Sequence, residues 1–566
     1  MFLSDLKNEI RKKVNSIEPN LGDRLDFSYP PSPEFGHLSA SCFNIAKSLD
    51  SSPAEISQRF ATELKIEPLE VRAVGPYVNF FLSPEYAAEK VIKEVKKLGA
   101  AYGANQGGGG KGVMIEYSNG NTHKEYHVGH LRNIAYGDAV SRLLAANGFK
   151  SIPVSYINDF GIHIAKTIWN WQRNPNYAER PEPKGYLLGK CYTEASRELE
   201  KNPEAKEEVG KIMTEIESRC GESYEFWEES RQWSIDYFSS IYKELGVKFE
   251  HIFYENEEIA AGLKLVQELL TKGILRKSEG AIIADLEKYG LGVLPIIRSD
   301  GTALYPVADL ALASEKFKQY DLYESIYVVD VRQSLYFKQL FKILELMGYK
   351  QPLVHLSYDF VTLPEGMMAS RTGNVITYQD LKDKLLEKLT AETKKRHIDW
   401  TDGRVAQVAG ELALATMKFE MLKVGAEKII TFNLEEAAKF DGYTACYLEY
   451  SYARLKSIVR KEGFNLLSLF GEPDWKKLTE KSENNLIIKL ARYPEIVAAA
   501  GAKYNPSEIA KYLFELAQMS NDYYHGVNIL KAAGPVRRAR IILVKAVAQV
   551  LKNGLEILGI RALEEM

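Results

Sequence analysis

The fold is organised by one stretch, Val113-Met-Ile-Glu-Tyr-Ser-Asn-Gly-Asn-Thr-His-Lys-Glu-Tyr-His-Val-Gly-His-Leu-Arg-Asn133, whose pattern is typical of a buried strand, a polar turn and the start of a helix. Val113 to Ile115 suit a central strand, and the polar residues after them favour a turn. Apolar residues then repeat at helical spacing from Gly129 to Gly148, a glycine that favours a helix end. His127 and His130 therefore lie where a strand passes into a helix. Free backbone N–H groups and the helix dipole attract anions there, so we expect a nucleotide phosphate as the ligand.

Two other interpretations of these histidines stay open. They could be exposed side chains at a helix N-cap, or they could form a metal site together with His123. A helix that places all three on one face would have to run through Gly129, and no further Cys or His cluster supports zinc. We therefore expect no structural zinc.

Length and composition place the chain among multidomain globular proteins. It has 566 residues, of which 45% are hydrophobic and 26% charged. The length predicts roughly three to five domains, and the balance is ordinary for a globular protein in water. Charges interrupt the apolar runs at the start of the chain, and nowhere do about twenty apolar residues stand together. These features predict a cytoplasmic protein without a membrane partner.

Cysteine spacing and charge distribution restrict the chemistry further. Cys42, Cys191, Cys220 and Cys446 are scattered without a CxxC pair, which favours reduced thiols over a zinc ribbon or a disulfide framework. The net charge is -3, but residues 451–566 hold 18 Lys and Arg against 12 Asp and Glu. RNA affinity comes largely from neutralised phosphates, so a basic face on a neutral body allows RNA binding.

The run His127-Val-Gly-His130, preceded by Asn121-Thr-His-Lys124, resembles the arginyl form of the "HIGH" signature of class I aminoacyl-tRNA synthetases. A bare HxGH would also fit other nucleotidylyltransferases of that superfamily, whereas the flanking residues favour the arginyl form. The resemblance implies a multidomain α/β protein. Its parts would be a Rossmann-like parallel-sheet catalytic domain with a helical insertion, an N-terminal α+β RNA-binding domain and a C-terminal all-α anticodon-binding bundle.

The resemblance also implies a reaction. ATP would activate L-arginine as arginyl-adenylate, with release of pyrophosphate, and arginine would then pass to the 3' end of tRNA(Arg). Activation in this family requires the tRNA. Catalysis would consist of orientation and charge stabilisation, because the arginine carboxylate is itself the nucleophile. The expected partners are tRNA(Arg), L-arginine and ATP, with Mg²⁺ carried by the ATP phosphates, and the expected state is a monomer.

The expected domains follow the order of the motifs. Residues 1–106 would form the N-terminal tRNA-binding domain, and the glycine-rich run 107–112 a flexible linker. The Rossmann catalytic domain would comprise 113–166 and 278–350, with the connective insertion at 167–277, the KMSKS-like loop and stem-contact region at 351–433, and the DALR-type anticodon-binding helices at 434–566.

The ATP site carries one departure from the family. Pro364 to Asn374 resembles the "KMSKS" loop in its form "GKMSTRKGN", yet Met367 and Ser370 stand in place of both signature lysines. Many arginyl-tRNA synthetases carry a lysine just before the HIGH sequence instead, and Lys124 fits that place. The resemblance thus implies Lys124, His127, His130 and Arg371 as catalytic residues, and His127, Gly129, His130, Gln333, Gly373 and Asn374 as ATP-binding residues.

The arginine site lies in two further motifs. Ser299 to Leu310 resembles "DGTxLYxTRD", with Pro306 and Ala308 as departures, and Ser325 to Gln333 is a buried strand whose Asp330 and Arg332 replace the usual residues. A guanidinium requires paired acceptors, and a carboxylate gives charge-assisted bonds, so Asp309 is the expected contact. Glu116 and Asn121 would hold the α-amino group. The implied arginine-binding residues are Glu116, Asn121, Tyr305, Asp309 and Gln333.

Two segments resemble the family's tRNA-binding regions. Gly75 to Phe81 is similar to "GPGFINFF", where Tyr77 would stack on an exposed base and Asn79 would hydrogen-bond it. Cys446 to Arg460 resembles "YLQYAxARxxSIxRK" at the entry to the DALR helices. The implied tRNA-binding residues are Tyr77, Asn79, Tyr450, Arg454, Tyr524 and Arg537. The alternative is that these aromatic residues belong to the core of a sheet and of a helical bundle.

Two other functions stay open at this point. An inactive relative could keep the fold as an RNA-binding module, which the missing loop lysines favour. A plain nucleotidylyltransferase would share HVGH but would need neither RNA domain.

Overall fold

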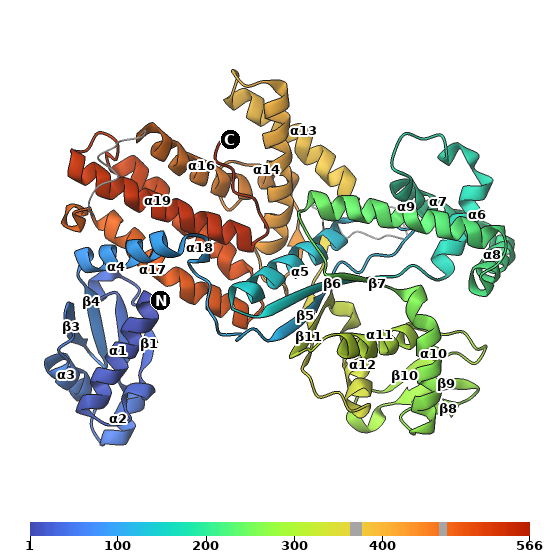
Figure 1. Cartoon of the computed structure of the whole chain (residues 1–566), viewed down its shortest axis with the longest axis horizontal. Coiled ribbons are helices and arrows are strands. Elements are labelled where there is room, and N and C mark those ends of the chain that lie inside the picture. The colour runs from blue at the N-terminus through green and yellow to red at the C-terminus, as the bar shows by residue number, and fades with distance from the viewer. Residues whose placement is uncertain (363–375, 463–472) are drawn as a thin grey trace.

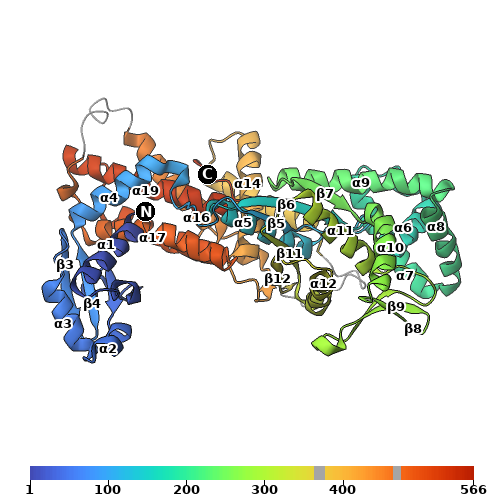
Figure 2. The same ribbon diagram turned by 60° about the horizontal axis from the view of Figure 1, so that its bottom comes forward.

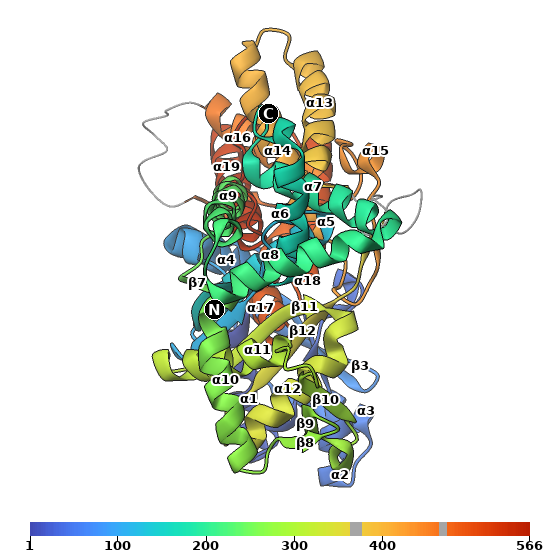
Figure 3. The same cartoon turned by 90° about the vertical axis from the view of Figure 1, so that its right-hand side faces the viewer.

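The computed structural model describes residues 1–362, 376–462 and 473–566. The prediction for Arg371, Gly373 and Asn374 lies outside these described residues. Figures 1, 2 and 3 show an N-terminal domain, a central sheet with helices around it and a C-terminal group of helices.

The central sheet is fully parallel, with the strand order β12-β11-β5-β6-β7. A parallel sheet needs helical crossovers on its faces, so the predicted Rossmann-like catalytic domain is confirmed. Strand β7 (His251–Tyr254), which the sequence pattern did not reveal, pairs with β6 at the edge of this sheet. The other strands are β5 (Gly112–Glu116), β6 (Lys150–Ile157), β11 (Glu324–Asp330) and β12 (Leu353–Tyr358).

Helix α5 (Val128–Ala146) is the central helix of the molecule (Figure 1). It is buried on almost every side, as expected of a helix in the core of a domain. Its buried polar residues are paired: Asn133 Nδ2 donates to the Val328 carbonyl at 2.7 Å. The position of α5 is therefore tied directly to β11.

A long helical excursion leaves the sheet after β6 and returns at β7. It contains α6 (Ile162–Arg173), α7 (Lys184–Lys201), α8 (Lys206–Ser218) and α9 (Glu222–Glu244). After β7 come α10 (Glu255–Thr271), a small antiparallel sheet of β8 (Arg276–Ser278), β9 (Ala281–Asp285) and β10 (Val293–Ile297), and then α11 (Tyr305–Gln319) and α12 (Ser334–Leu346). The excursion lies at one end of the molecule, on the right in Figure 1.

The N-terminal domain packs helices against an antiparallel sheet of order β1-β2-β4-β3, as the α+β prediction required. Its link to the rest of the molecule includes an ion pair of 2.6 Å between Lys7 and Glu495. Its strands are β1 (Asp26–Ser28), β2 (Leu38–Ser41), β3 (Leu69–Val74) and β4 (Tyr77–Leu82), and its helices are α1 (Phe2–Ile17), α2 (Phe43–Leu49), α3 (Pro53–Glu63) and α4 (Pro84–Leu98).

The described part of the chain after Leu434 is helical, which confirms the all-α C-terminal region. Helices α13 (Tyr378–Arg396) and α14 (Asp402–Leu422) precede this region in the chain. They lie side by side and project away from the sheet (Figure 3). A short parallel pair of strands, β13 (Val361–Thr362) and β14 (Ile430–Thr431), connects the chain after β12 with the chain after α14. The remaining helices are α15 (Leu434–Ala437), α16 (Ala445–Glu462), α17 (Lys481–Ala502), α18 (Ser507–Gly526) and α19 (Gly534–Ile557).

The glycine run 107–112 is not the flexible linker that its composition predicts. Gly108 N donates to the Asn147 carbonyl and Gly110 N to the Gly148 carbonyl, each at 2.8 Å. A Cβ at position 108 would lie 2.5 Å from the Phe149 ring. Glycine is thus required here because the chain passes close to the end of α5, and these contacts fix the turn.

None of the helices in the described residues is long and apolar enough to cross a membrane.

Candidate active site

The described residues predicted for catalysis and for binding ATP and arginine meet at one cavity of about 900 Å³. Glu116 ends β5 and Asp330 ends β11, so the cavity opens at the carboxyl edge of the parallel sheet, where α/β proteins bind ligands. The cavity brings together nine of the predicted residues: Glu116, Asn121, Lys124, His127, Gly129, His130, Tyr305, Asp309 and Gln333.

His127 and His130 form a stacked pair at the first turn of α5. Their ring centroids lie 3.9 Å apart. His127 Nδ1 accepts a hydrogen bond from Gly129 N at 3.1 Å, and His130 Nδ1 accepts from His127 N at 3.2 Å. A Cβ on residue 129 would approach the His127 ring to 2.9 Å, so this capping arrangement requires glycine.

The two rings are neutral donors. Burial lowers the pKa of His127 to about 4 and that of His130 well below its ordinary value. Because each Nδ1 accepts a backbone N–H, each neutral ring carries its proton on Nε2. Both residues line the cavity, and these N–H groups can donate to an anion there.

His123 does not join this pair in a metal site. It lies in the turn before α5, with a φ of 61°. Its Nε2 is 2.9 Å from the Ser230 hydroxyl. The metal interpretation required all three histidines on one helical face, and the helix begins only at Val128.

The residues on either side of segment 363–375 are attached to the start of α5. Arg132 donates to the carbonyls of Phe360, Ala426 and Lys428 at 2.8 to 3.1 Å. Beyond the segment, Val128 N donates to the Ile376 carbonyl at 3.3 Å. The described residues that flank 363–375 therefore lie against the first turns of α5.

Lys124 lines the cavity beside the histidines. Its ammonium lies 5.4 Å from the centre of the Tyr192 ring, and it has no ion pair among the described residues. Burial lowers the Lys124 pKa, and Lys166 lowers it further. A half-buried cation that forms no ion pair with the described residues is a favourable place for a phosphate.

Asp309 faces the cavity from α11, four residues after Tyr305, as the helical spacing predicts. The Tyr336 hydroxyl donates a hydrogen bond to Asp309 Oδ2. Burial raises the pKa of Asp309 to about 7, and the Glu116 carboxylate also raises it. Tyr305 is 66% exposed at the start of the helix.

The sequence patterns did not identify two charged residues of this region, Glu255 and Lys316. Glu255 begins α10, and burial raises its pKa to about 8, with Asp309 among the further causes. It follows β7, so recognising that strand would have placed Glu255 at the sheet's carboxyl edge. Lys316 forms a buried ion pair with Glu116. Its position seven residues after Asp309 on one helix is the signal that could have found it.

Asp330 and Arg332, the two departures from the family motif, neutralise each other. Arg332 Nε and Nη2 donate to the Asp330 carboxylate at 2.8 and 3.0 Å. The guanidinium also lies 4.5 Å from the centre of the Phe360 ring. Both side chains line the cavity beside Gln333.

The predicted base contacts of the N-terminal domain differ in exposure. Tyr77 is 39% exposed, and its ring meets that of Phe43 edge-on at 6.2 Å. Asn79 is only 3% exposed, and its Oδ1 accepts a hydrogen bond from the Ser39 hydroxyl at 2.6 Å. Its role as a base contact stays a prediction, and a base would have to reach an amide that a neighbouring strand largely covers.

Three of the C-terminal candidates lie together. The Arg454 guanidinium lies 4.5 Å from the Tyr450 ring centre and 5.0 Å from that of Tyr524, so α16 and α18 jointly build a cation–π cluster. Arg537 stands apart from this cluster and pairs with Glu462 at 3.4 Å.

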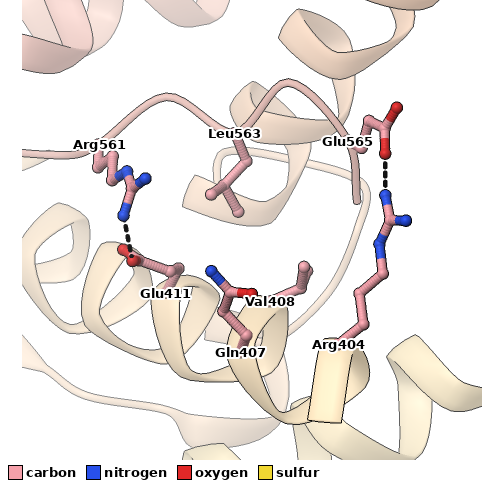
Figure 4. A pocket seen from close by; sticks show the side chains of 7 residues that line it. All are labelled: Arg404, Gln407, Val408, Glu411, Arg561, Leu563 and Glu565. Atoms are coloured by element: carbon pink, nitrogen blue, oxygen red, sulfur yellow. Dashed lines mark hydrogen bonds and ion pairs between the residues drawn. The ribbon is translucent and has the colours of Figure 1, made fainter. Parts of the chain in front are cut away.

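A second cavity, of about 480 Å³, lies where the C-terminal residues pass over α14 (Figure 4). Arg561 pairs with Glu411 at 2.8 Å, and Arg404 pairs with Glu565. None of the predicted site residues lines this cavity. Its charged side chains pair with one another, and these ion pairs attach the C-terminal residues to α14.

Comparison with known proteins agrees with this arrangement along the whole chain. Residues 4–82 match the family described as "Arginyl tRNA synthetase N terminal domain", residues 93–432 "tRNA synthetases class I (R), catalytic domain" and residues 448–566 "DALR anticodon binding domain". The chain is 35% identical to the arginine–tRNA ligase of Bdellovibrio bacteriovorus, covering 99% of this chain and 98% of that protein. It is 32% identical to the arginine–tRNA ligase of Halothermothrix orenii, with 100% of both covered.

Among solved structures, the Thermus thermophilus arginyl-tRNA synthetase superposes with a TM-score of 0.84 at 26% identity, covering 100% of both chains. The matches in sequence, domain order and overall fold show that this chain belongs to the arginyl-tRNA synthetase family.

Proposed function

We propose that this protein is an arginine–tRNA ligase that forms arginyl-adenylate from ATP and L-arginine and then charges tRNA(Arg). The observation that supports this most directly is the single cavity that holds the neutral histidine pair, Lys124 and Asp309. One end of that cavity offers donors and a cation, and another offers a carboxylate. A nucleotide triphosphate and an arginine side chain have the complementary charges.

The first step takes place at the start of α5. The arginine carboxylate attacks the α-phosphorus of ATP, a bond forms between them, and the bond to the leaving pyrophosphate breaks. Nε2–H groups of His127 and His130 would donate to phosphate oxygens, and the Lys124 ammonium would offset the charge that develops. We further propose that Arg371 assists Lys124 and that Gly129, Gln333, Gly373 and Asn374 contact ATP.

The second step transfers arginine to RNA. A ribose hydroxyl at the 3' end of the tRNA attacks the carbonyl carbon of the adenylate, and AMP leaves. Both steps require precise orientation more than a protein nucleophile. We propose that the tRNA is also required for the first step.

The guanidinium of arginine would bind between Asp309 and Glu255. Burial raises the pKa values of both carboxyls, and neither forms an ion pair with a cation of the described residues, so a guanidinium would supply a direct partner. Tyr305 would cover the substrate at the mouth of the cavity. Glu116, Asn121 and Gln333 would surround the α-amino group.

Mg²⁺ would enter with ATP, bound to its phosphate oxygens. The groups beside the proposed phosphate position are Lys124, His127 and His130, which fit an anion and not a cation. The carboxylates of Glu116 and Asp309 are engaged by Lys316 and Tyr336. The metal would neutralise phosphate charge.

Exposed aromatic and basic side chains would bind the tRNA. Tyr77 offers a face for an unpaired base, and the cluster of Tyr450, Arg454 and Tyr524 offers two more beside a guanidinium. Arg537 would contribute charge. We propose a cytoplasmic monomer: the four cysteines are free thiols, which fits a reducing compartment, and light scattering should give 64.0 kDa.

Pyrophosphate exchange tests the function. Protein, ATP, arginine and tRNA(Arg) are mixed with labelled pyrophosphate, and label should enter ATP only when arginine and the tRNA are both present. Exchange that ignores tRNA would favour a plain nucleotidylyltransferase. No exchange under any condition would favour an inactive RNA-binding relative.

A further inference from the structure

One face of α11 lines the arginine cavity. Tyr305, Asp309, Leu312 and Lys316 all border it, at spacings of four, three and four residues. Residues at these spacings lie in one stripe along a helix. The proposed function uses the first two, whereas Lys316 has no role in it.

The Lys316 side chain is buried from solvent in the wall of the cavity. It is 1% exposed and forms an ion pair with Glu116, whose side chain is 4% exposed. The Tyr327 ring centre lies 4.8 Å from the ammonium. Glu116 Oε1 accepts a further hydrogen bond from Asn119 Nδ2 at 2.9 Å. Lys316 and Asn119 thus hold the two oxygens of Glu116 in place.

The same ammonium also acts on Asp309. The Glu116 charge raises the pKa of Asp309, whereas the Lys316 charge lowers it. Asp309 and Glu116 in turn both favour the charged form of Lys316. Two carboxylates in one buried pocket repel each other, and a cation that acts on both offsets that repulsion. The titratable groups that face Lys316 and Asp309 from the surrounding elements are Glu116 of β5, Tyr156 of β6, Glu255 of α10, Tyr327 of β11 and Tyr336 of α12.

We propose that Lys316 is a positioning residue of the arginine pocket: its buried ammonium fixes Glu116 toward the substrate and supplies the positive charge that lets Glu116 and Asp309 stay ionised together. This rests on the proposed use of the cavity for arginine. Lys316 does not touch the reacting phosphate in this proposal. It acts through the two carboxylates.

Lys316→Met tests the proposal, with the exposed Lys318→Met on the same helix as the matched control. The KM values for arginine and ATP are measured in tRNA-dependent exchange from about pH 6 to about pH 9. Lys316→Met should raise the arginine KM at least about tenfold and change the ATP KM less than about twofold. The pH at which arginine binding weakens should move upward. Lys316→Arg should restore most of the affinity, and Lys318→Met should match the parent protein.

A double replacement covers the case in which Lys316→Met does not fold. Glu116→Gln with Lys316→Met removes both members of the buried ion pair, so neither is left without its partner and the fold should survive. It should still show an arginine KM raised at least about tenfold, because the fixed acceptor is lost. The proposal is overturned if a folded Lys316→Met, or the folded double variant in its place, binds arginine like the parent protein at every pH. Loss of exchange in the parent protein itself would instead refute the proposed function.

Discussion

Replacing Asp309 with asparagine is expected to raise the KM for arginine strongly. Asp309 lies in the cavity with its carboxylate bonded to the Tyr336 hydroxyl. The amide keeps the size and the acceptor oxygen of the side chain but loses its charge. A hydrogen bond to a charged group contributes about 2 to 3 kcal/mol, so the arginine KM should rise about 30- to 150-fold.

The pH dependence of the parent protein follows from the same carboxyl group. The pKa of Asp309 is about 7 because the group is buried, so Asp309 takes up a proton as the pH falls through that value. The protonated acid no longer attracts a guanidinium. From about pH 8 to about pH 6, this group alone should weaken arginine binding about tenfold. Glu255, with a pKa of about 8, adds to the effect in the same direction.

Initial rates of tRNA-dependent pyrophosphate exchange at varied arginine concentration measure both effects. The KM for ATP is determined in parallel, because ATP itself titrates near the low end of this range. Asp309→Asn should show a shallower dependence of the arginine KM on pH than the parent protein. The exposed Asp321→Asn serves as the control for a lost surface charge. An arginine KM within about twofold of the parent in Asp309→Asn, or a flat pH profile in the parent, refutes this reasoning.

Three further outcomes are expected. Lys124→Ala should lower the exchange rate at least about tenfold while the exposed Lys272→Ala leaves it unchanged, because a cation at the phosphate end offsets developing charge; equal rates would contradict that role. Arg454→Ala should raise the KM for tRNA about three- to tenfold without changing exchange kinetics for ATP and arginine, and should make the tRNA KM less dependent on salt. Glu449→Gln should raise the melting temperature. Burial raises the pKa of Glu449 to about 8, so the stabilising effect of the protonated carboxyl is lost as the pH rises from about 4.5 through about 8. The free energy of unfolding should therefore be at least about 1 kcal/mol higher in the amide variant at alkaline pH, with a smaller difference near pH 5. The Leu563 N–H that donates to Glu449 at 2.8 Å keeps its acceptor in this variant, and a melting temperature that is lowered at every pH would show that the charge is not the cause.

Local pattern was sufficient for the elements that carry the site. The apolar run at Val113 gave β5, and the helical repeat after His127 gave α5. The four-residue spacing of Tyr305 and Asp309 correctly predicted that both lie on one helix beside the cavity. Patterns of this kind depend on residues close together in the chain, and the period of a helix or strand makes them visible.

Pairings between distant segments could not be obtained in this way. Lys316 and Glu116 are 200 residues apart, and nothing local to either one indicates an ion pair. Strand β7 has four residues, too few for a clear alternation, so Glu255 was missed with it. The glycine run 107–112 shows the converse error, since its composition predicts flexibility and its contacts with the end of α5 remove it.

The sequence by itself determined the order of the main domains and the placement of two histidines at the N-terminus of a central helix. The tertiary structure decided which charges share the cavity and which side chains remain at the surface, as with exposed Tyr77 and covered Asn79. The physical reason is that the period of a helix or strand is a local property of the backbone. Burial and the pairing of charges depend on what the rest of the chain places beside each residue.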